Sequence, residues 1–297
     1  MANMLKILRK KARDTNISVN ARAAAKELIV LSRKPTAVKR VRPTFFLIGA
    51  MKAGTTSLFN NLVLHPQISE PVSKEIRYFD FHFNRGEAWY LAHFPLIRSA
   101  QKRGETIAGE ASPSYMFDPH APDRIKRFSP NSRLVIMLRN PVDRAYSHYQ
   151  HSVRYWGETR SFADAIRIEE DWMGEEQELR IKDPQQMPVK RIQYSYLTRG
   201  RYIEQIMRWD SVFGRENLLI LQAEEYFQKP ENIMPKVLSF LNLADWQPEQ
   251  FQRLNMARYK QLSDDVRDQT YDYFTESNMA LYEYLGKSFD WEKDRYD

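Results

Sequence analysis

The stretch from residue 44 to residue 62 constrains the fold of this chain more than any other. Four of the five residues from Thr44 to Ile48 are apolar, which predicts a buried strand. A turn with Gly49 and Gly54 follows, and apolar residues then recur four apart, as on the buried face of a helix. Such a turn brings backbone N–H groups and the positive end of a helix together. The stretch therefore predicts an anion-binding loop.

Side chains in this loop favour the same ligand. Lys52 has a full positive charge, and hydroxyl groups follow Gly54. Gly49 and Gly54 have the spacing of the Walker A loop, G-x-x-x-x-G-K-[ST], but Thr55 stands where its lysine belongs, and the lysine of this chain lies inside the loop. A phosphate or a group of similar shape is the expected ligand. The residues expected to contact it are Lys52, Ala53, Gly54, Thr55, Thr56 and Ser57.

A second strand, turn and helix repeat this architecture near the middle of the chain. Residues 133–138 predict another buried strand, and a helix begins near Val142. Arg139 follows the carboxyl end of that strand, the edge at which ligands bind in open α/β sheets. Arg139 and Ser147 together suit a second phosphate, which the guanidinium binds in a bidentate manner. The alternative for each unit is a structural turn that binds nothing.

Strands and helices alternate along the rest of the chain. Two more strands are expected at residues 106–110 and 218–221. Helices are expected at residues 21–31, 87–94, 119–128, 142–155, 161–171, 202–213, 237–241 and 263–284, and an exposed loop at 174–190. This order predicts an α/β domain at residues 43–297, with a P-loop-like parallel sheet flanked by helices on both faces.

The positive charge of the chain is concentrated at its N-terminus. Residues 1–42 contain twelve Lys or Arg and two Asp or Glu, whereas residues 43–297 contain 33 and 36. The body therefore has no excess of basic residues, and we expect no nucleic-acid partner. Residues 1–42 are interpreted as a basic helical arm, which contacts either an anionic membrane surface or its own domain.

Composition excludes several other classes of protein. The absence of cysteine excludes disulfides, thiolate zinc sites and a cysteine nucleophile, and it suits a reducing cytoplasm. No apolar run reaches the roughly 18 residues of a transmembrane span. None of the six histidines has the spacing of a metal site, so no metal is expected. We expect a cytoplasmic protein, with membrane association through the arm as an open alternative.

The two loops together resemble those of sulfotransferases that use 3′-phosphoadenosine 5′-phosphosulfate (PAPS). The loop around Lys52 is similar to their 5′-phosphosulfate loop, and R-N-P-V-D-R-A-Y-S-H-Y is similar to their 3′-phosphate motif. The resemblance extends through most of residues 44–291. It is closest to heparan sulfate N-deacetylase/N-sulfotransferase and 3-O-sulfotransferase enzymes and their bacterial relatives. It implies PAPS as co-substrate, no metal, and a small-molecule or glycan acceptor with a hydroxyl or amine.

The same resemblance indicates the catalytic residues. Residues 74–80 are similar to the segment that bears the catalytic glutamate, which maps onto Glu75, while Lys52 is suited to stabilise charge on the leaving phosphate. Glu110 lies in a segment similar to a second acidic motif and is the competing base, although Ala111 replaces a lysine found there in many members. Contacts to the acceptor are expected from Arg77, Asp80, Glu110, His148 and His151.

A catalytic carboxylate benefits from an apolar setting that raises its pKa. We expect Tyr78, Phe79, Phe81 and Trp89 to supply that setting around Glu75. Near the C-terminus, Arg258 and Tyr259 match part of the Lys-Gly-Arg-x-x-Pro loop that closes over the nucleotide in the resembled family, so both are expected to contact the nucleotide. Met256 and Ala257 replace the lysine and the glycine of that loop.

Two other functions fit part of the sequence. The first is a P-loop phosphotransferase that uses ATP and magnesium. Against it stand Thr55 in the lysine position and the lack of a convincing metal-binding aspartate after a later strand. The second is a scaffold without enzymatic activity that the basic arm holds at a membrane. The presence of two nucleotide loops argues against it.

Overall fold

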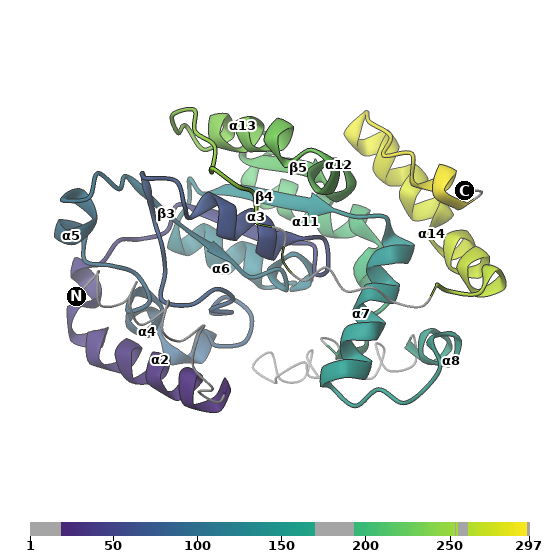
Figure 1. Cartoon of the computed structure of the whole chain (residues 1–297), viewed down its shortest axis with the longest axis horizontal. Coiled ribbons are helices and arrows are strands. Elements are labelled where there is room, and N and C mark those ends of the chain that lie inside the picture. The colour runs from purple at the N-terminus through teal and green to yellow at the C-terminus, as the bar shows by residue number, and fades with distance from the viewer. Residues whose placement is uncertain (1–18, 170–192, 253, 255–260, 296–297) are drawn as a thin grey trace.

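Parallel strands form the centre of this computed structural model, which describes residues 19–169, 193–252, 254 and 261–295 (Figure 1). Within these residues the sheet has five strands. Their spatial order is β2 (Ile68–Ser69), β3 (Ile107–Ala111), β1 (Phe45–Gly49), β4 (Arg133–Leu138) and β5 (Leu218–Gln222). All neighbours pair in parallel. The carboxyl ends of β1 and β4, the two strands followed by the predicted loops, therefore lie side by side.

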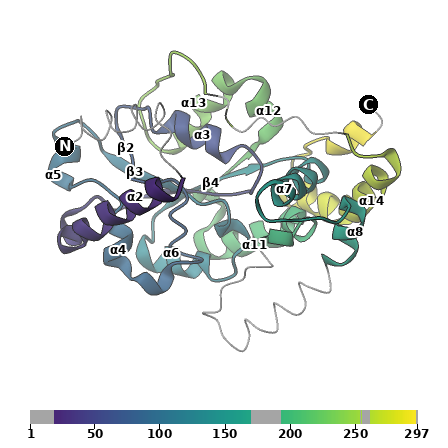
Figure 2. The same cartoon turned by 60° about the horizontal axis from the view of Figure 1, so that its bottom comes forward.

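Helices cover both faces of this sheet, as Figures 1 and 2 show. One face carries α3 (Thr55–Leu62), α12 (Ala223–Gln228) and α13 (Pro230–Phe240), and the other carries α6 (Ala121–Phe128) and α11 (Tyr202–Phe213). Every residue of β1 is consequently buried. A strand covered on both sides needs apolar residues throughout, which explains its continuous apolar run. The predicted fold class is confirmed.

The remaining helices lie at the two ends of the sheet (Figures 1 and 2). At one end are α2 (Val19–Arg33), α4 (Glu87–Leu91) and α5 (Ile97–Gln101). At the opposite end are α7 (Pro141–Tyr155), α8 (Phe162–Arg167) and α14 (Asp264–Leu285). Short 3₁₀ turns occupy Lys34–Lys39, Phe83–Arg85, Tyr115–Phe117, Thr198–Gly200, Arg215–Asn217 and Trp291–Arg295. None of the described helices combines the length and the apolar content that crossing a membrane requires.

Most predicted elements agree with the observed ones to within a few residues, with one instructive difference. The helix expected from residue 119 begins at Ala121. Asp118 accepts hydrogen bonds from the backbone N–H groups of His120 and Ala121 (2.8 and 3.0 Å), so its side chain makes a turn of its own before the helix starts. The predicted loop at 174–190 lies outside the described residues, as does the end of the helix expected at 161–171.

The described part of the basic arm packs against the domain. Val30 is buried in the main hydrophobic core. Glu27 of α2 forms an ion pair with Arg85 (2.5 Å). The buried Arg40 donates a hydrogen bond to the carbonyl oxygen of Phe94 (2.7 Å). Residues 27–40 are therefore tied to the body of the protein, whereas residues 1–18 lie outside the described part of the chain.

Candidate active site

The loop between β1 and α3 has the geometry of an anion site. Gly54 precedes the first turn of α3 with a left-handed backbone (φ 85°). A Cβ atom at Gly54 would lie 2.5 Å from the ring of Phe227, so both the backbone angle and the close contact require glycine. The first N–H groups of α3 have no carbonyl within the helix to bond. The loop therefore presents backbone donors and the positive helix end at one place, as predicted.

Lys52 lies in this loop beside other charged groups of the site. Burial, followed by the nearby positive charge of Arg139, lowers the pKa of Lys52 to about 8, while the charge of Glu75 acts in the opposite direction. A cation held in this way gains strongly from a bound anion, because the anion compensates both the lost hydration and the repulsion. The electrostatics of Lys52 thus favour a negatively charged ligand.

The loop between β4 and α7 joins the first one directly. The guanidinium of Arg139 donates a hydrogen bond to the carbonyl oxygen of Lys52 (3.2 Å). Asn140 caps α7 by accepting a hydrogen bond from the N–H of Val142 (3.1 Å). Ser147, two turns into α7, is buried. The loops of the two predicted phosphate sites therefore meet at the carboxyl edge of the sheet.

Two contacts of these loops were not part of the sequence interpretation. The hydroxyl of Ser57 bonds with the backbone of Leu254, donating to its oxygen (3.3 Å) and accepting from its nitrogen (2.9 Å). In addition, the ring of Phe227 contacts Gly54, and its centre lies 5.9 Å from the guanidinium carbon of Arg139. Nothing in the sequence around Phe227, which lies on a later helix, indicated a position between the two loops.

Glu75 lies in the loop that precedes α4, with a left-handed backbone (φ 57°). Its side chain is nearly half exposed (48%), and Lys74 forms an ion pair with it at 2.5 Å. Burial acts to raise the pKa of Glu75, but the charge and hydrogen bond of Lys74, followed by the charges of Arg77 and His151, outweigh it and lower the pKa. The expectation that an apolar setting raises this pKa is therefore wrong, because cations surround the carboxylate.

The apolar setting surrounds Glu110 instead. Glu110 lies on β3 with no exposed surface. Burial raises the pKa of Glu110 to about 7, although hydroxyl groups of Ser112, Tyr90 and Tyr115 all donate to it. The predicted aromatic residues Tyr78 and Phe79 pack in this layer, where their rings stack on or meet the edge of Tyr90.

The two histidines of α7 have different surroundings. His151 is half-buried, and burial followed by the charge of Lys52 lowers its pKa to about 4, against the influence of Glu75. It therefore lies with Lys52 and Glu75 in one electrostatic cluster. His148 is fully buried, and its ring packs edge-to-face against Tyr196 with centroids 5.1 Å apart.

Arg77 and Asp80 interact with each other in the segment that follows Glu75. The guanidinium of Arg77 stacks on the ring of Phe81 (3.9 Å to the ring centre) and lies 3.8 Å from a carboxylate oxygen of Asp80. Burial raises the pKa of Asp80 to about 6. The predicted nucleotide contacts Arg258 and Tyr259 lie outside the described residues. The sequence interpretation did not assign Lys74 to the site. Its position directly before the proposed base is the signal that could have identified it.

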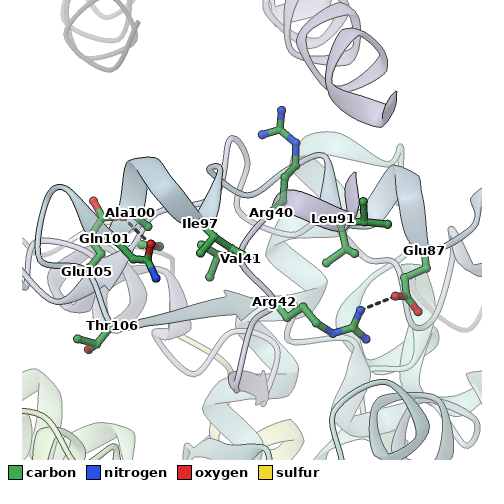
Figure 3. A pocket seen from close by; sticks show the side chains of 12 residues that line it. Arg40, Val41, Arg42, Glu87, Leu91, Ile97, Ala100, Gln101, Glu105 and Thr106 are labelled. Atoms are coloured by element: carbon green, nitrogen blue, oxygen red, sulfur yellow. Dashed lines mark hydrogen bonds and ion pairs between the residues drawn. The ribbon is translucent and has the colours of Figure 1, made fainter. Parts of the chain in front are cut away.

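A separate cleft does not coincide with these loops. It has a volume of about 480 Å³ and lies among η1 (Lys34–Lys39), α4 and α5 (Figure 3). Figure 3 shows Arg42 paired with Glu87 (2.5 Å), while Glu105 accepts a hydrogen bond from Ser69 (2.6 Å). The carboxylates of Glu87 and Glu105 in this cleft thus already have partners within the chain. In the described part of the chain, no three potential metal ligands cluster.

Comparison with known proteins agrees with this geometry. Residues 42–294 match the sulfotransferase domain family. A crystal structure of a sulfotransferase from Alicyclobacillus acidocaldarius is similar with a TM-score of 0.65 and 29% sequence identity, over 85% of this chain and 99% of that one.

Curated relatives share the same domain but are longer proteins. Human bifunctional heparan sulfate N-deacetylase/N-sulfotransferase 3 is 30% identical over 68% of this chain and 22% of its own length. The membrane-associated sulfotransferase kil1 of Dictyostelium discoideum is 24% identical over 84% of this chain and 66% of its own length. The matched region thus spans about two thirds of one relative and under a quarter of the other. Because the family match covers most of the sequence, the chain belongs to the sulfotransferase domain family.

Proposed function

We propose that this protein transfers the sulfuryl group of PAPS to a hydroxyl or amine acceptor, with Glu75 as the base. The observation that carries the proposal is the joining of two anion loops at neighbouring strands, where Arg139 bonds to the carbonyl of Lys52 (3.2 Å). PAPS has phosphates at both the 5′ and the 3′ position of one ribose, so it needs two adjacent anion sites. A nucleotide with phosphate only at the 5′ end needs one.

Different residues bind the two ends of the nucleotide in this proposal. The backbone donors at Gly54, Thr55 and Thr56, with Lys52, bind the 5′-phosphosulfate, and Arg139 with Ser147 binds the 3′-phosphate. Phe227 offers an apolar ring between the two sites, 38% exposed and in contact with Gly54. Arg258 and Tyr259 remain proposed nucleotide contacts on the strength of their motif alone.

The reaction is an in-line displacement at sulfur. The acceptor oxygen or nitrogen forms a bond to sulfur, and the bond from sulfur to the bridging oxygen of the 5′-phosphate breaks. The products are the sulfated acceptor and 3′-phosphoadenosine 5′-phosphate. Negative charge builds on the bridging oxygen, where Lys52 and the N–H groups of the loop stabilise it.

Glu75 takes the proton that the acceptor loses. Its lowered pKa keeps the carboxylate ionised at neutral pH, so that it is ready to accept a proton. The interaction of its charge with those of Lys52 and His151 locates it beside the 5′ loop, where the sulfuryl group lies in this proposal. His151, with a pKa of about 4, is neutral at physiological pH and suited to hydrogen-bond the acceptor.

The surroundings of Glu75 also bear on the acceptor. Lys74 and Arg77 flank the base, and Arg154 is close enough to lower the pKa of Lys52. Cations around the entry favour an acceptor that itself carries negative charge. We propose a carbohydrate acceptor because several relatives are heparan sulfate enzymes by name. Incubation with radiolabelled PAPS and fractionated glycans and metabolites, followed by chromatography, identifies what becomes labelled.

The closest alternative is an ATP-dependent phosphotransferase, and nucleotide preference separates the two. Calorimetric titration with 3′-phosphoadenosine 5′-phosphate and with AMP, both in EDTA, measures the contribution of the 3′-phosphate. A charge-assisted bidentate contact contributes about 1.5–3 kcal/mol, so we expect roughly 10- to 100-fold tighter binding of the bisphosphate. Equal affinities, or tight ATP binding that requires magnesium, would favour the phosphotransferase.

The basic arm suggests where the protein acts. We propose that residues 1–42 contact an anionic membrane peripherally, since they combine a net charge of +10 with exposed apolar side chains such as Leu28 (69%) and Val38 (86%). Sedimentation with vesicles of neutral lipid, with and without phosphatidylglycerol, tests this. Binding that is independent of anionic lipid would contradict it. Replacement of Val38 by Asp should weaken binding, whereas the same replacement of the exposed Met279 on α14 (65%) should not.

A further inference from the structure

The loop that bears Glu75 is fastened along one side to β3 and the turn that follows it. Alternate backbone N–H groups of the loop donate to that segment: Glu75 to the carbonyl oxygen of Ala111 (3.0 Å), Arg77 to the hydroxyl of Ser112 (3.1 Å) and Phe79 to the hydroxyl of Tyr115 (3.3 Å). Two of these three acceptors are side-chain hydroxyl groups rather than backbone carbonyls. The position of the loop therefore depends on what holds those hydroxyls.

Glu110 holds both of them through one carboxylate oxygen. Ser112 and Tyr115 each donate to Oε1 of Glu110, at 2.5 and 2.8 Å. When a hydroxyl donates its proton to a carboxylate, its lone pairs point away from that carboxylate. In Ser112 and Tyr115, a lone pair then accepts a hydrogen bond from a backbone N–H of the loop. The second oxygen, Oε2, accepts a hydrogen bond from Tyr90 (2.7 Å), which comes from α4. The two oxygens thus serve different parts of the structure.

The loop needs such anchors because its backbone is unusual. Glu75 and Arg77 both have left-handed angles, φ 57° and 56°, without being glycine. Residues in this region persist only when their surroundings impose the conformation. Anchors at both of these residues and at Phe79 supply that constraint. If they were lost, the loop would relax and the carboxylate of Glu75 would move away from Lys52.

We propose that Glu110 is a positioning residue for Glu75, acting through the hydroxyls of Ser112 and Tyr115, and is not itself the base. The inference rests on the proposed function in taking Glu75 as the base. The sequence context of Glu110 makes it an alternative candidate for the base. Its carboxylate is fully buried, however, and therefore cannot reach an acceptor.

Backbone hydrogen exchange of the resting protein tests the anchoring itself. Exchange at Arg77 and Phe79, resolved by NMR, should accelerate roughly tenfold or more in Glu110→Ala. Ser112→Ala should affect Arg77 most, and Tyr115→Phe should affect Phe79 most. Tyr90→Phe is the matched control, since it removes a hydrogen bond to the same carboxylate but none to the loop. Unprotected N–H groups in the wild type, or equal acceleration in Tyr90→Phe, would overturn the anchoring.

Kinetics then test whether the anchoring serves Glu75. Glu110→Ala, Ser112→Ala and Tyr115→Phe should each lower kcat roughly 10- to 100-fold, as expected for a misplaced catalytic group, with nucleotide Kd changed less than about twofold. In a Glu75→Gln background the same substitutions should have little further effect, because no base remains to be positioned. Additive losses in that background would overturn the proposal.

The conservative variant separates positioning from catalysis. In Glu110→Gln the amide oxygen still accepts from both hydroxyls, so kcat should stay within about threefold of wild type. A loss as large as that of Glu75→Gln would make Glu110 the base and refute the proposal. Failure of the wild type to bind 3′-phosphoadenosine 5′-phosphate would refute the proposed function, while the exchange experiment would still decide whether Glu110 anchors the loop.

Discussion

The nucleotide side and the acceptor side of the site are built in different ways. On the nucleotide side, the loops after β1 and β4 connect strands to the N-termini of α3 and α7, so regular elements fix backbone donors in place. On the acceptor side, Glu75 lies in an irregular loop with two left-handed residues. Side-chain hydroxyls, oriented by the buried Glu110, hold that loop. One side owes its geometry to secondary structure and the other to a polar network.

This difference separates binding from turnover. On the nucleotide side, Lys52 and Arg139 repel each other and gain when an anion arrives, although Asp143 lies 4.0 Å from the guanidinium of Arg139. The acceptor side has its charges paired, with Lys74 bound to Glu75 and Arg77 beside Asp80. Changes on the first side should therefore appear in nucleotide affinity, and changes on the second in the rate of transfer. Four experiments test that division.

The largest effect is expected on the acceptor side. Glu75→Gln retains the shape of the side chain but removes the base, so turnover should fall by roughly 10²–10⁴ while nucleotide affinity stays within a few-fold. Steady-state kinetics and calorimetry measure the two quantities. Glu87→Gln is the control, because Glu87 is also an exposed carboxylate in an ion pair but lines the cleft among η1, α4 and α5. Near-normal turnover of Glu75→Gln would show that the base does not lie in this loop.

The same contrast between regular elements and a side-chain network determines which features could be predicted from the sequence alone. The strand and glycine pattern around Lys52 and the strand before Arg139 follow local rules, so the fold and both loops were predictable. The burial of Glu110 was not, because it depends on Tyr90 and Tyr115, from two separate elements, meeting one carboxylate on a third. Phe227 was missed for the same reason: no local pattern indicates a contact with Gly54 from a helix that begins at residue 223.

The second effect concerns stability and pH. A rise of the Glu110 pKa from 4.5 to about 7 means that the folded protein binds the proton more tightly than the unfolded chain. Its contribution to the free energy of unfolding is therefore fully present below pH 4.5 and decreases as pH rises to 7, by about 3 kcal/mol in all. Glu110→Gln lacks this term.

Urea denaturation of wild type and Glu110→Gln between pH 4.5 and 8 isolates the contribution, since other groups are common to both proteins. Relative to wild type, the variant should gain stability across that window and then level off. Glu75→Gln should show the opposite sign, but only below pH 4.5: the lowered pKa of Glu75 keeps the contribution of its ion pair constant above that pH, and this contribution is lost as pH falls further. A difference that does not change with pH would mean that Glu110 titrates normally.

The third effect falls on the nucleotide side. Arg139→Ala should weaken binding of 3′-phosphoadenosine 5′-phosphate by roughly 10- to 100-fold and binding of AMP far less, because only the former has a 3′-phosphate. Competition calorimetry gives the ratio of the two constants. The exposed Arg98 on α5, replaced by Ala, controls for loss of a positive charge elsewhere. An equal loss for both nucleotides would place Arg139 at the 5′ end.

The smallest effect distinguishes the two loops from each other. Lys52 has a pKa of about 8 in the free protein, lowered by burial and then by Arg139, and a bound phosphate should raise it again. Binding at the 5′ loop then takes up a proton above pH 8, so affinity for AMP and for the bisphosphate should decline by up to about tenfold between pH 7 and 9. Adenosine 3′-monophosphate, which engages only Arg139 and Ser147, should show no such decline. Lys52→Arg should abolish the pH dependence while retaining the charge, since arginine stays protonated throughout. If adenosine 3′-monophosphate and AMP weakened in parallel, Lys52 would serve both phosphates, and the assignment of one loop to each end of the nucleotide would be wrong.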